Sequence, residues 1–257
     1  MDEIDKRIIF QLMKNARTPL KEISEKIGIS AQALNYRVSR LQESGVIRKF
    51  SLHVNPQIKG MISGFAAFRN SGYESDRIVS RFKCLEEITI YEFNGKDQNE
   101  VYECINDATR KLGEPFMKYI PQPRQLNMSF GKLDFEIIEI LKESPRLPVL
   151  SIAEKLNVKP SVARKRLAMM EKNRVINAVA EIDLAKTDST ILSIISSSVE
   201  SLFPYFGDNI IFYISDRGNG IIVGYADNLK KARGTIEKIR ETDPLTQVMV
   251  VYEYEFN

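Results

Sequence analysis

One internal repeat constrains this 257-residue chain more than any other feature. Residues 4–47 align without a gap with residues 133–176 after a shift of 129 positions. The positions that are identical in both copies include Asp5/Asp134, Ile8/Ile137, Ile9/Ile138, Leu12/Leu141, Arg17/Arg146, Pro19/Pro148, Ile23/Ile152, Lys26/Lys155, Arg37/Arg166, Val46/Val175 and Ile47/Ile176. A repeat of this length indicates a duplicated domain, not one unit of a solenoid. Whatever the first copy does, the chain should do at two places.

Apolar residues at helical spacing predict three helices in the first copy. The first helix is amphipathic, with apolar positions at Ile4, Ile8, Ile9, Leu12 and Met13. The second is expected to start at Thr18-Pro19 and to stop at Gly28, because proline suits a first helical turn and glycine suits a left-handed end. Ser30 can cap the third helix, which buries the stripe Leu34, Val38 and Leu41 and ends at Gly45. The second and third helices, joined by a three-residue turn, predict a helix-turn-helix.

The second copy keeps this pattern and changes the surface. Asn157 stands at the position of Gly28, and asparagine is the next most tolerant residue for positive φ. Pro160 is expected to open the third helix of this copy, whose apolar stripe we assign to Val162, Leu167 and Met170. In the first copy, apolar residues between positions 46 and 54 predict an extended segment, a wing that carries Arg48 and Lys49.

Positive charge is concentrated in the repeated segments. Residues 1–55 carry a net charge of +4 and residues 132–187 carry +3, whereas residues 56–131 are neutral and residues 188–257 carry −4. Such a division suggests that the two repeated segments meet a polyanion and that the others do not. Solvated helix faces of ordinary proteins also carry surpluses of this size.

Composition predicts a soluble globular protein of the cytoplasm. Hydrophobic residues make up 43% of the chain and charged residues 28%. No uncharged stretch approaches the roughly 18 apolar residues of a membrane span, and the N-terminus has no apolar signal core. Cys84 and Cys104 lack a metal-type spacing, so we expect both to be reduced cysteines in the core or in a strand. Phosphate-binding glycine loops and zinc spacings are missing as well, so we expect no cofactor and no metal.

Four runs of residues carry a family resemblance. They are residues 4–12, the pair Ala16-Arg17, residues 23–30 and residues 38–47. Together they resemble the N-terminal winged helix-turn-helix of the Lrp/AsnC (feast/famine) family of prokaryotic transcription regulators. The resemblance covers nearly all of residues 1–55, and the second copy is similar more loosely. Members of that family carry one such domain and one small βαββαβ domain, so this chain looks like two units fused head to tail.

The resemblance implies an α+β fold in which two winged helix-turn-helix domains alternate with two ferredoxin-like βαββαβ domains. The expected boundaries are 1–55, 60–131, 132–187 and 188–257.

In the first intervening segment the pattern predicts strands at 61–69, 87–93, 99–105 and 124–130 and helices at 76–84 and 107–119, with a hairpin at Asn94-Gly95. In the last it predicts strands at 191–197, 210–215, 221–226 and 247–256, and helices at 199–205 and 228–241.

The outward face of each third helix is the predicted DNA-reading surface. With its apolar stripe buried, the first one presents Gln32, Asn35, Tyr36, Ser39 and Arg40. Amide side chains can pair with adenine and arginine with guanine, so this face is expected to enter the major groove of double-stranded DNA. The corresponding residues of the second copy are Ser161, Arg164, Lys165, Ala168 and Met169, so the two modules should prefer different bases. The remaining predicted DNA contacts are Ser30, Arg37, Arg48, Lys49 and Arg166.

Structural roles are the alternative for several of these residues. Ser30 caps a helix whether or not it touches DNA, and Arg37 and Arg166 can pair with acidic neighbours instead. Tyr36 can be a packing residue, and the Met169-Met170 pair is also compatible with a second module that packs on protein.

Pairing of the βαββαβ domains within one chain would make a pseudo-dimer, whose operator should have unequal half-sites. A homodimer through the same domains is the alternative. The resemblance also implies an amino-acid effector near the hairpin glycines, which places candidate contacts at Gly95, Asp97, Gly218 and Gly220. Turn formation is the alternative role of these glycines.

Two other function classes compete with DNA reading. Siroheme decarboxylases share the same architecture and are expected to rely on histidines, whereas this chain has one histidine, His53. A protein-interaction scaffold that has lost DNA affinity is the other class. The sequence favours a regulator without enzymatic activity.

Overall fold

The computed structural model describes residues 1–69, 72–122, 126 and 128–256. The chain forms two compact units, each built from both halves of the sequence. The first, here called the sheet unit, comprises residues 1–10, 61–123 and 183–257. The second, the helical unit, comprises residues 11–60 and 124–182. Each compact unit combines two of the four predicted domains, one from each half of the chain. The division into four separate domains therefore stays a prediction.

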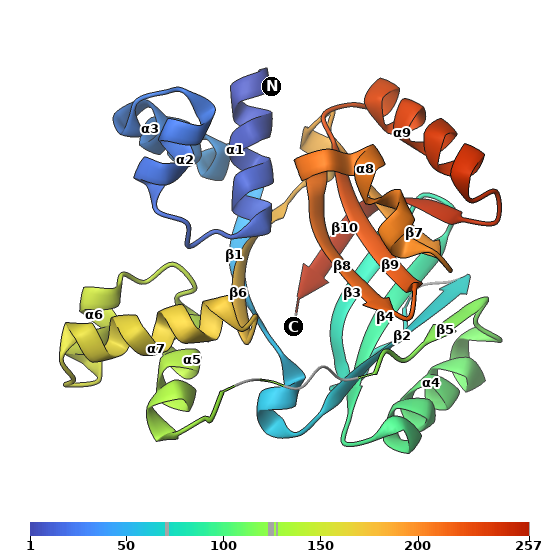
Figure 1. The fold of residues 1–257 in the computed structure, drawn as a ribbon, viewed down its shortest axis with the longest axis horizontal. Helices are drawn as coiled ribbons and strands as arrows, with labels where there is room; N and C mark the ends of the chain where they lie inside the picture. The colour runs from blue at the N-terminus through green and yellow to red at the C-terminus, as the bar shows by residue number, and fades with distance from the viewer. Residues whose placement is uncertain (70–71, 123–125, 127, 257) are drawn as a thin grey trace. The chain divides into compact units, whose positions relative to one another are not determined.

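The helical unit contains two three-helix modules and one strand from each. The first module has α1 (Glu3–Lys14, whose residues up to Phe10 count with the sheet unit), α2 (Leu20–Ile27), α3 (Ala31–Glu43), β1 (Ile47–Val54) and a 3-10 turn, η1 (Pro56–Lys59). The second has α5 (Lys132–Glu143), α6 (Val149–Lys155), α7 (Pro160–Lys172) and β6 (Ile176–Ile182). Figure 1 shows both modules beside the ribbon of β1 and β6.

The turns that define both helix-turn-helix motifs are confirmed. Gly28 takes the left-handed conformation (φ 84°) and ends α2. The Ser30 hydroxyl accepts a 3.1 Å hydrogen bond from the Ala33 amide and so caps α3. Asn157 also has positive φ (51°), and α7 begins at Pro160. The fold is therefore specified twice with different turn residues.

One predicted core position of α7 is wrong. Val162 has 42% of its surface exposed, whereas Ala163 is fully buried. Ala163 is the counterpart of Leu34 in the first copy, so the helix keeps its orientation while a smaller residue fills the buried position.

The predicted wing is extended but does not form a separate hairpin. Instead β1 pairs antiparallel with β6, its own repeat counterpart. Leu52 and Val54 of β1 pack against the apolar core of the second module. Burial of this apolar face is the physical reason that the segment joins the two modules.

The sheet unit holds one eight-stranded antiparallel sheet in the order β5-β2-β4-β3-β10-β7-β9-β8. The first half of the chain supplies β2 (Ile62–Arg69), β3 (Ile78–Cys84), β4 (Ile88–Gly95), α4 (Gln98–Leu112) and β5 (Met117–Tyr119). The second half supplies β7 (Thr190–Ser196), α8 (Phe203–Phe206), β8 (Ile210–Asp216), β9 (Asn219–Ala226), α9 (Leu229–Thr242) and β10 (Gln247–Phe256), with short 3-10 turns η2 (Leu184–Lys186), η3 (Val199–Leu202) and η4 (Gly207–Asn209). In Figure 1, α4 and α9 lie over the parts of the sheet that their own halves supply.

The elements predicted for the last segment are confirmed, and several of the first are wrong. Residues 76–84, predicted as a helix, form β3, whose buried positions alternate as in a strand. The predicted strand at 99–105 belongs to α4, because Val101, Ile105 and Ala108 are buried together at helical spacing. Residues 107–119, predicted as one helix, contain the end of α4 and all of β5. Part of the predicted strand at 124–130 lies outside the described residues.

Strand β10 joins the two halves of the sheet. Its first part, Gln247–Val251, pairs with β7, and its second part pairs with β3. Opposite charges face each other across the second junction, since Lys83 lies 3.2 Å from Glu253 and Arg81 lies 3.0 Å from Glu255. The pairing therefore occurs within one chain and is supported by complementary charge.

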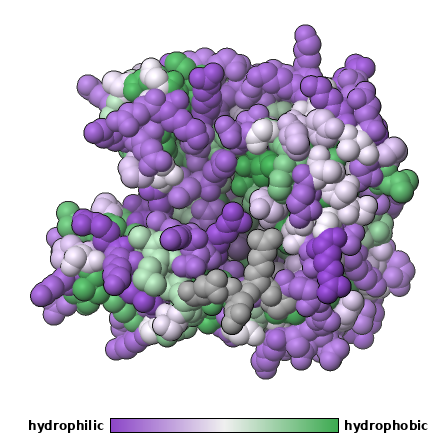
Figure 2. All heavy atoms as spheres, viewed as in Figure 1, coloured by the Kyte–Doolittle hydropathy of each residue, from purple (hydrophilic) through white to green (hydrophobic). Residues whose placement is uncertain are grey.

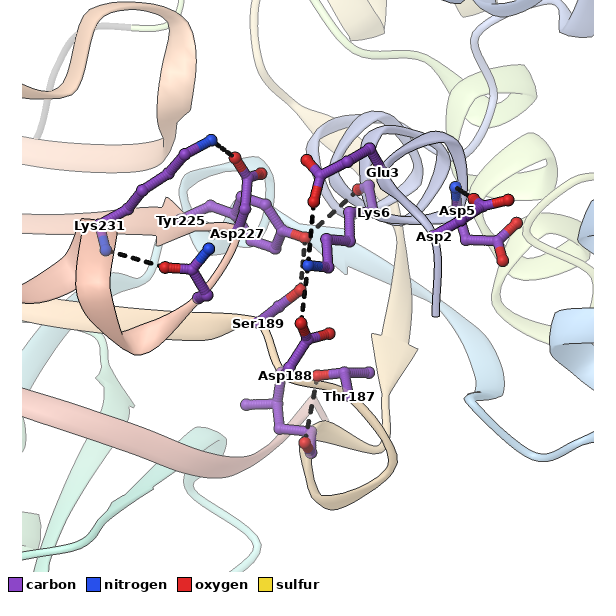
Figure 3. Close-up of polar contacts among 12 residues, drawn as sticks. Asp2, Glu3, Asp5, Lys6, Thr187, Asp188, Ser189, Tyr225, Asp227 and Lys231 are labelled. Carbon is purple, nitrogen blue, oxygen red and sulfur yellow. Dashed lines mark hydrogen bonds and ion pairs between the residues drawn. The ribbon is translucent and has the colours of Figure 1, made fainter.

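A buried lysine holds the start of α1 in the sheet unit (Figure 3). Lys6, with 5% of its side chain exposed, pairs with Asp188 at 2.7 Å and with Glu3 at 3.2 Å. The hydrogen bond to Asp188 raises the pKa of Lys6 to about 12. Beside it, Tyr225 shares a 2.6 Å hydrogen bond with Ser189 and stacks on Phe10.

Two kinds of feature are absent from the described residues. None of their helices is long and apolar enough to cross a membrane. Nor do their histidine, cysteine, aspartate and glutamate side chains form a cluster of three or more that could hold a metal ion.

Candidate nucleic-acid interface

The outward face of α3 carries polar side chains, as predicted. Burial of Leu34, Val38 and Leu41 fixes the rotation of the helix. The side chains left exposed by this rotation are Gln32, Asn35, Tyr36, Ser39 and Arg40. Tyr36 is 63% exposed, which argues against its alternative role in packing, and the Arg40 guanidinium lies 5.8 Å from the centre of its ring.

The predicted contacts around α3 have mixed environments. Ser30 caps the helix and remains exposed. Arg37 is half-buried, and Arg48 is exposed on β1. Lys49 is exposed too, but its ammonium lies 3.4 Å from the buried carboxylate of Glu181 on β6. Lys49 therefore contributes to the β1–β6 ribbon, and its contact with phosphate stays a prediction.

The outward face of α7 is basic. Ser161, Arg164 and Lys165 are exposed, whereas Met169 is half-buried and Met170 is fully buried. Met170 thus belongs to the core of the module.

Arg166 takes the structural role that was its alternative. Its Nε donates to Asp134 Oδ1 at 2.6 Å, its Nη2 pairs with the other oxygen, and Nη2 also donates to the Ser129 carbonyl at 2.9 Å. Asp134 is 1% exposed, and its hydrogen bonds raise the pKa of the guanidinium. This arginine closes a buried ion pair that ties α7 to the start of α5.

The register of the β1–β6 ribbon relates the two modules by a pseudo-twofold axis. Phe50 faces Ala180, and Ser51 faces Val179. Under the repeat shift, Ala180 is the counterpart of Ser51, and Val179 is the counterpart of Phe50. Each pair is therefore converted into the other by exchanging the two copies. The pseudo-axis passes through the middle of the ribbon, between the strands that follow α3 and α7 in the sequence.

Direct contacts lock the modules together around this axis. Arg17, with 8% of its side chain exposed, donates from Nη1 to the carbonyls of Pro145 (2.8 Å) and Leu147 (3.0 Å) and from Nε to Glu171 (3.1 Å). Backbone bonds run from Ala16 to Ala178 and from Asn55 to Val175, each 2.7 Å long.

The repeat counterpart of Arg17 makes a different contact. The Arg146 guanidinium lies 4.7 Å from the centre of the Phe50 ring. Burial, with the nearby charge of Arg17, lowers the pKa of Arg146. The sequence did not single out these arginines as interface residues, although their identity in both copies was a signal that could have found them.

The four predicted effector contacts have roles in folding. Asp97 caps α4 through a 2.9 Å bond from the Glu100 amide, so Asn94-Gly95 ends a strand before a helix and is not a hairpin turn. A side chain on Gly95 would come within 2.8 Å of the Val101 nitrogen. Gly218 has φ of 90° in the β8–β9 hairpin, and a side chain on Gly220 would meet the Ile214 carbonyl oxygen at 1.9 Å.

Comparison with known proteins identifies relatives among transcription regulators. A family model described as winged helix-turn-helix DNA-binding matches residues 1–48 and 131–177, one match in each copy. The chain is 30% identical over 151 residues to the HTH-type transcriptional regulator FL11 of Pyrococcus furiosus, covering 58% of this chain and 97% of that protein. It is 36% identical over 93 residues to the HTH-type transcriptional regulator LrpA of Pyrococcus horikoshii, covering 36% of this chain and 62% of LrpA.

A solved structure matches nearly the whole chain. The siroheme decarboxylase NirDL aligns with a TM-score of 0.50 and 12% identity, covering 98% of this chain and 92% of that chain. At this identity the likeness concerns the fold alone. The relatives that share sequence with this chain are named as transcription regulators, and this favours a regulator over a decarboxylase.

Proposed function

Since this chain belongs to the Lrp/AsnC family of winged helix-turn-helix transcription regulators, we propose that it binds duplex DNA with both α3 and α7. One polypeptide then does what a dimer of single-module chains does, and its operator is a bipartite site. We place this activity in the cytoplasm, where the chromosome of a prokaryote lies.

The observation that carries the proposal is the symmetry of the β1–β6 ribbon. Two helix-turn-helix motifs can engage one face of a duplex when a twofold axis relates their third helices, because the two strands of DNA are themselves related by such axes. The ribbon supplies a pseudo-axis between α3 and α7. The Arg17 contacts hold the modules as one body, so the two reading helices keep a constant separation.

Exposed charge supports the proposal. The repeated segments carry the positive charge of the chain, and Arg40, Arg48, Arg164 and Lys165 are exposed on them. Cations at phosphates release counterions, so the affinity should fall steeply with salt, by a logarithmic slope of about 0.9 per phosphate neutralised.

Fluorescence anisotropy with a mixed-sequence duplex at several salt concentrations tests the proposal. We expect salt-dependent binding that weakens in Arg40→Ala. Arg110→Ala is the matched control, because it removes an exposed arginine from α4 in the sheet unit. Equal affinity of wild type and Arg40→Ala, or a salt slope of zero, would contradict DNA binding by α3.

An amino-acid effector is a separate expectation from the resemblance. Each of the four residues predicted to contact it also has a folding role in this structure, and an effector contact at these positions stays a prediction. Calorimetric titration with the twenty amino acids tests for an effector anywhere in the chain.

A further inference from the structure

We infer that α3 and α7 divide the work of DNA recognition: α3 selects bases, and α7 grips the backbone with little base preference. The inference rests on the proposed function and specifies the operator. It should contain one half-site of defined bases, rich in A·T pairs, and one half-site that is nearly degenerate.

The exposed face of α3 carries groups that discriminate between bases. Gln32 and Asn35 lie one helical turn apart and are both exposed. A side-chain amide can donate from its NH2 group to N7 of adenine and accept through its oxygen from the N6 amino group at the same time, which fixes both the base and the side chain. Arg40 lies against the ring of Tyr36, so its guanidinium is held near the same face. Pre-positioned polar groups of this kind give selectivity as well as affinity.

At the same positions α7 lacks amides. Ser161 replaces Gln32, Arg164 replaces Asn35 and Lys165 replaces Tyr36. The residues of α7, Pro160–Lys172, include neither asparagine nor glutamine. Of these three residues only Arg164 can pair with a base edge, that of guanine, whereas a lysine ammonium is a point charge that binds phosphate without distinguishing bases.

Charge on the two helices differs in the same sense. Between their bounds, α3 has two basic residues and one acidic residue, whereas α7 has four basic residues and one acidic residue. One of the four, Arg166, is held by Asp134 within the module. The remaining cations still give α7 the stronger electrostatic contribution, which is independent of sequence.

The second module also exposes apolar side chains where the first has small or charged ones. Leu150 on α6 is 56% exposed at the position of Lys21, and Val162 on α7 is 42% exposed at the position of Ala33. In Figure 2, hydrophobic atoms lie among hydrophilic ones on the surface of the module formed by α5, α6 and α7. Apolar groups can touch sugars and thymine methyl groups, but they form no hydrogen bonds to base edges.

Selection of bound duplexes from a random library by the full chain tests the inference. We expect a motif in which one half-site is well defined and the other is weakly defined, while footprinting shows protection over both. The variant Gln32→Ala/Asn35→Ala should lose the defined half-site, and Asn35→Ala alone should weaken binding to the selected duplex by roughly 5- to 150-fold. Arg164 is the repeat counterpart of Asn35. Arg164→Ala should weaken binding to all duplexes alike and lower the salt slope by about one.

A gain-of-function variant tests the inference by an effect that misfolding cannot produce. Ser161→Gln/Arg164→Asn copies the amides of α3 onto exposed positions of α7. Its selected motif should gain base preference in the second half-site and approach a palindrome.

Three outcomes would overturn the division of work. Two equally defined half-sites in the wild-type motif, such as an invariant guanine facing α7, would show that α7 selects bases. Protection over one half-site only, with no effect of Arg164→Ala, would show that the second module faces another partner, such as a protein. Retention of no duplex at all, by a chain with a normal unfolding transition, would overturn the proposed function itself.

Discussion

Arg17→Ala should weaken the contact between the two helix-turn-helix modules more than Arg146→Ala, the same substitution at its repeat counterpart. The Arg17 side chain is nearly buried, and its three hydrogen bonds all end on the second module. Removing it leaves two backbone carbonyls and the Glu171 carboxylate without these donors. Arg17 therefore tests whether the modules form one body.

The expected cost follows from the number and kind of these bonds. A hydrogen bond from a charged group contributes about 1.5–3 kcal/mol, and contributions from one side chain do not add fully. Glu171 is 32% exposed, so water can replace part of its lost interaction. We expect Arg17→Ala to lower the free energy of unfolding of the helical unit by about 3 kcal/mol.

The repeat provides a matched control at Arg146. Its guanidinium gains about 0.5–2 kcal/mol over the Phe50 ring, but burial and the nearby Arg17 charge oppose it. Arg146→Ala should therefore cost less than about 1 kcal/mol. Urea unfolding followed by circular dichroism measures both variants. Equal losses, or a loss below about 1 kcal/mol for Arg17→Ala, would refute the assignment of Arg17 as the intermodule lock.

Three further predictions concern single features of the two units. Asp134→Asn removes the carboxylate of the buried ion pair at the start of α5 and should lower the unfolding free energy by about 2 kcal/mol, as measured by urea unfolding. The Lys6–Asp188 pair should stabilise the sheet unit fully below about pH 10.5 and lose this effect as pH rises through 12, because the folded pKa of Lys6 is raised to about 12. Thermal unfolding from pH 9 to 12 should show a smaller pH dependence in Lys6→Met. Gly220→Ala should cost about 3 kcal/mol, whereas Gly234→Ala, in the open interior of α9, should stabilise by about 0.5–1 kcal/mol.

Each of these predictions has a contrary result. An unchanged unfolding midpoint in Asp134→Asn would mean that the ion pair contributes nothing net. The same pH dependence in wild type and Lys6→Met would assign the alkaline loss of stability to other groups. Equal effects at Gly220 and Gly234 would contradict the close approach of the Ile214 carbonyl in the hairpin.

The helix-turn-helix modules could be predicted from sequence because their signals are local. Gly28, Asn157 and Ser30 act within one turn of the chain, and each apolar stripe recurs within one helix. The repeat supplied a second, independent copy of the same pattern. For that reason the exposed face of α3 could be assigned residue by residue, and that of α7 except at Val162 and Met169.

Two of the features predicted incompletely or wrongly depend on distant partners. Residues 78–84 form a strand in which Arg81 and Lys83 meet Glu255 and Glu253 of β10, a strand that lies far away in the sequence. Likewise the predicted wing, β1, pairs with β6, a strand that begins more than 120 residues later in the sequence. Local periodicity carries no information about such pairings.

The site residues divide along the same line. Exposure of Gln32, Asn35 and Arg164 followed from helix periodicity alone. The engagement of Arg166 with Asp134 and of Lys49 with Glu181 depends on tertiary contacts, so a list of surface cations from sequence includes residues that serve the fold.

The most direct test of the central claim is a combined measurement of stoichiometry and footprint on a duplex selected by the chain. Native mass spectrometry counts the chains on the duplex, and hydroxyl-radical footprinting maps the protected backbone. If one polypeptide carries two readers about a pseudo-twofold axis, one chain should protect two patches on the same face of the duplex, a whole number of helical turns apart. A single protected patch per chain would contradict the account.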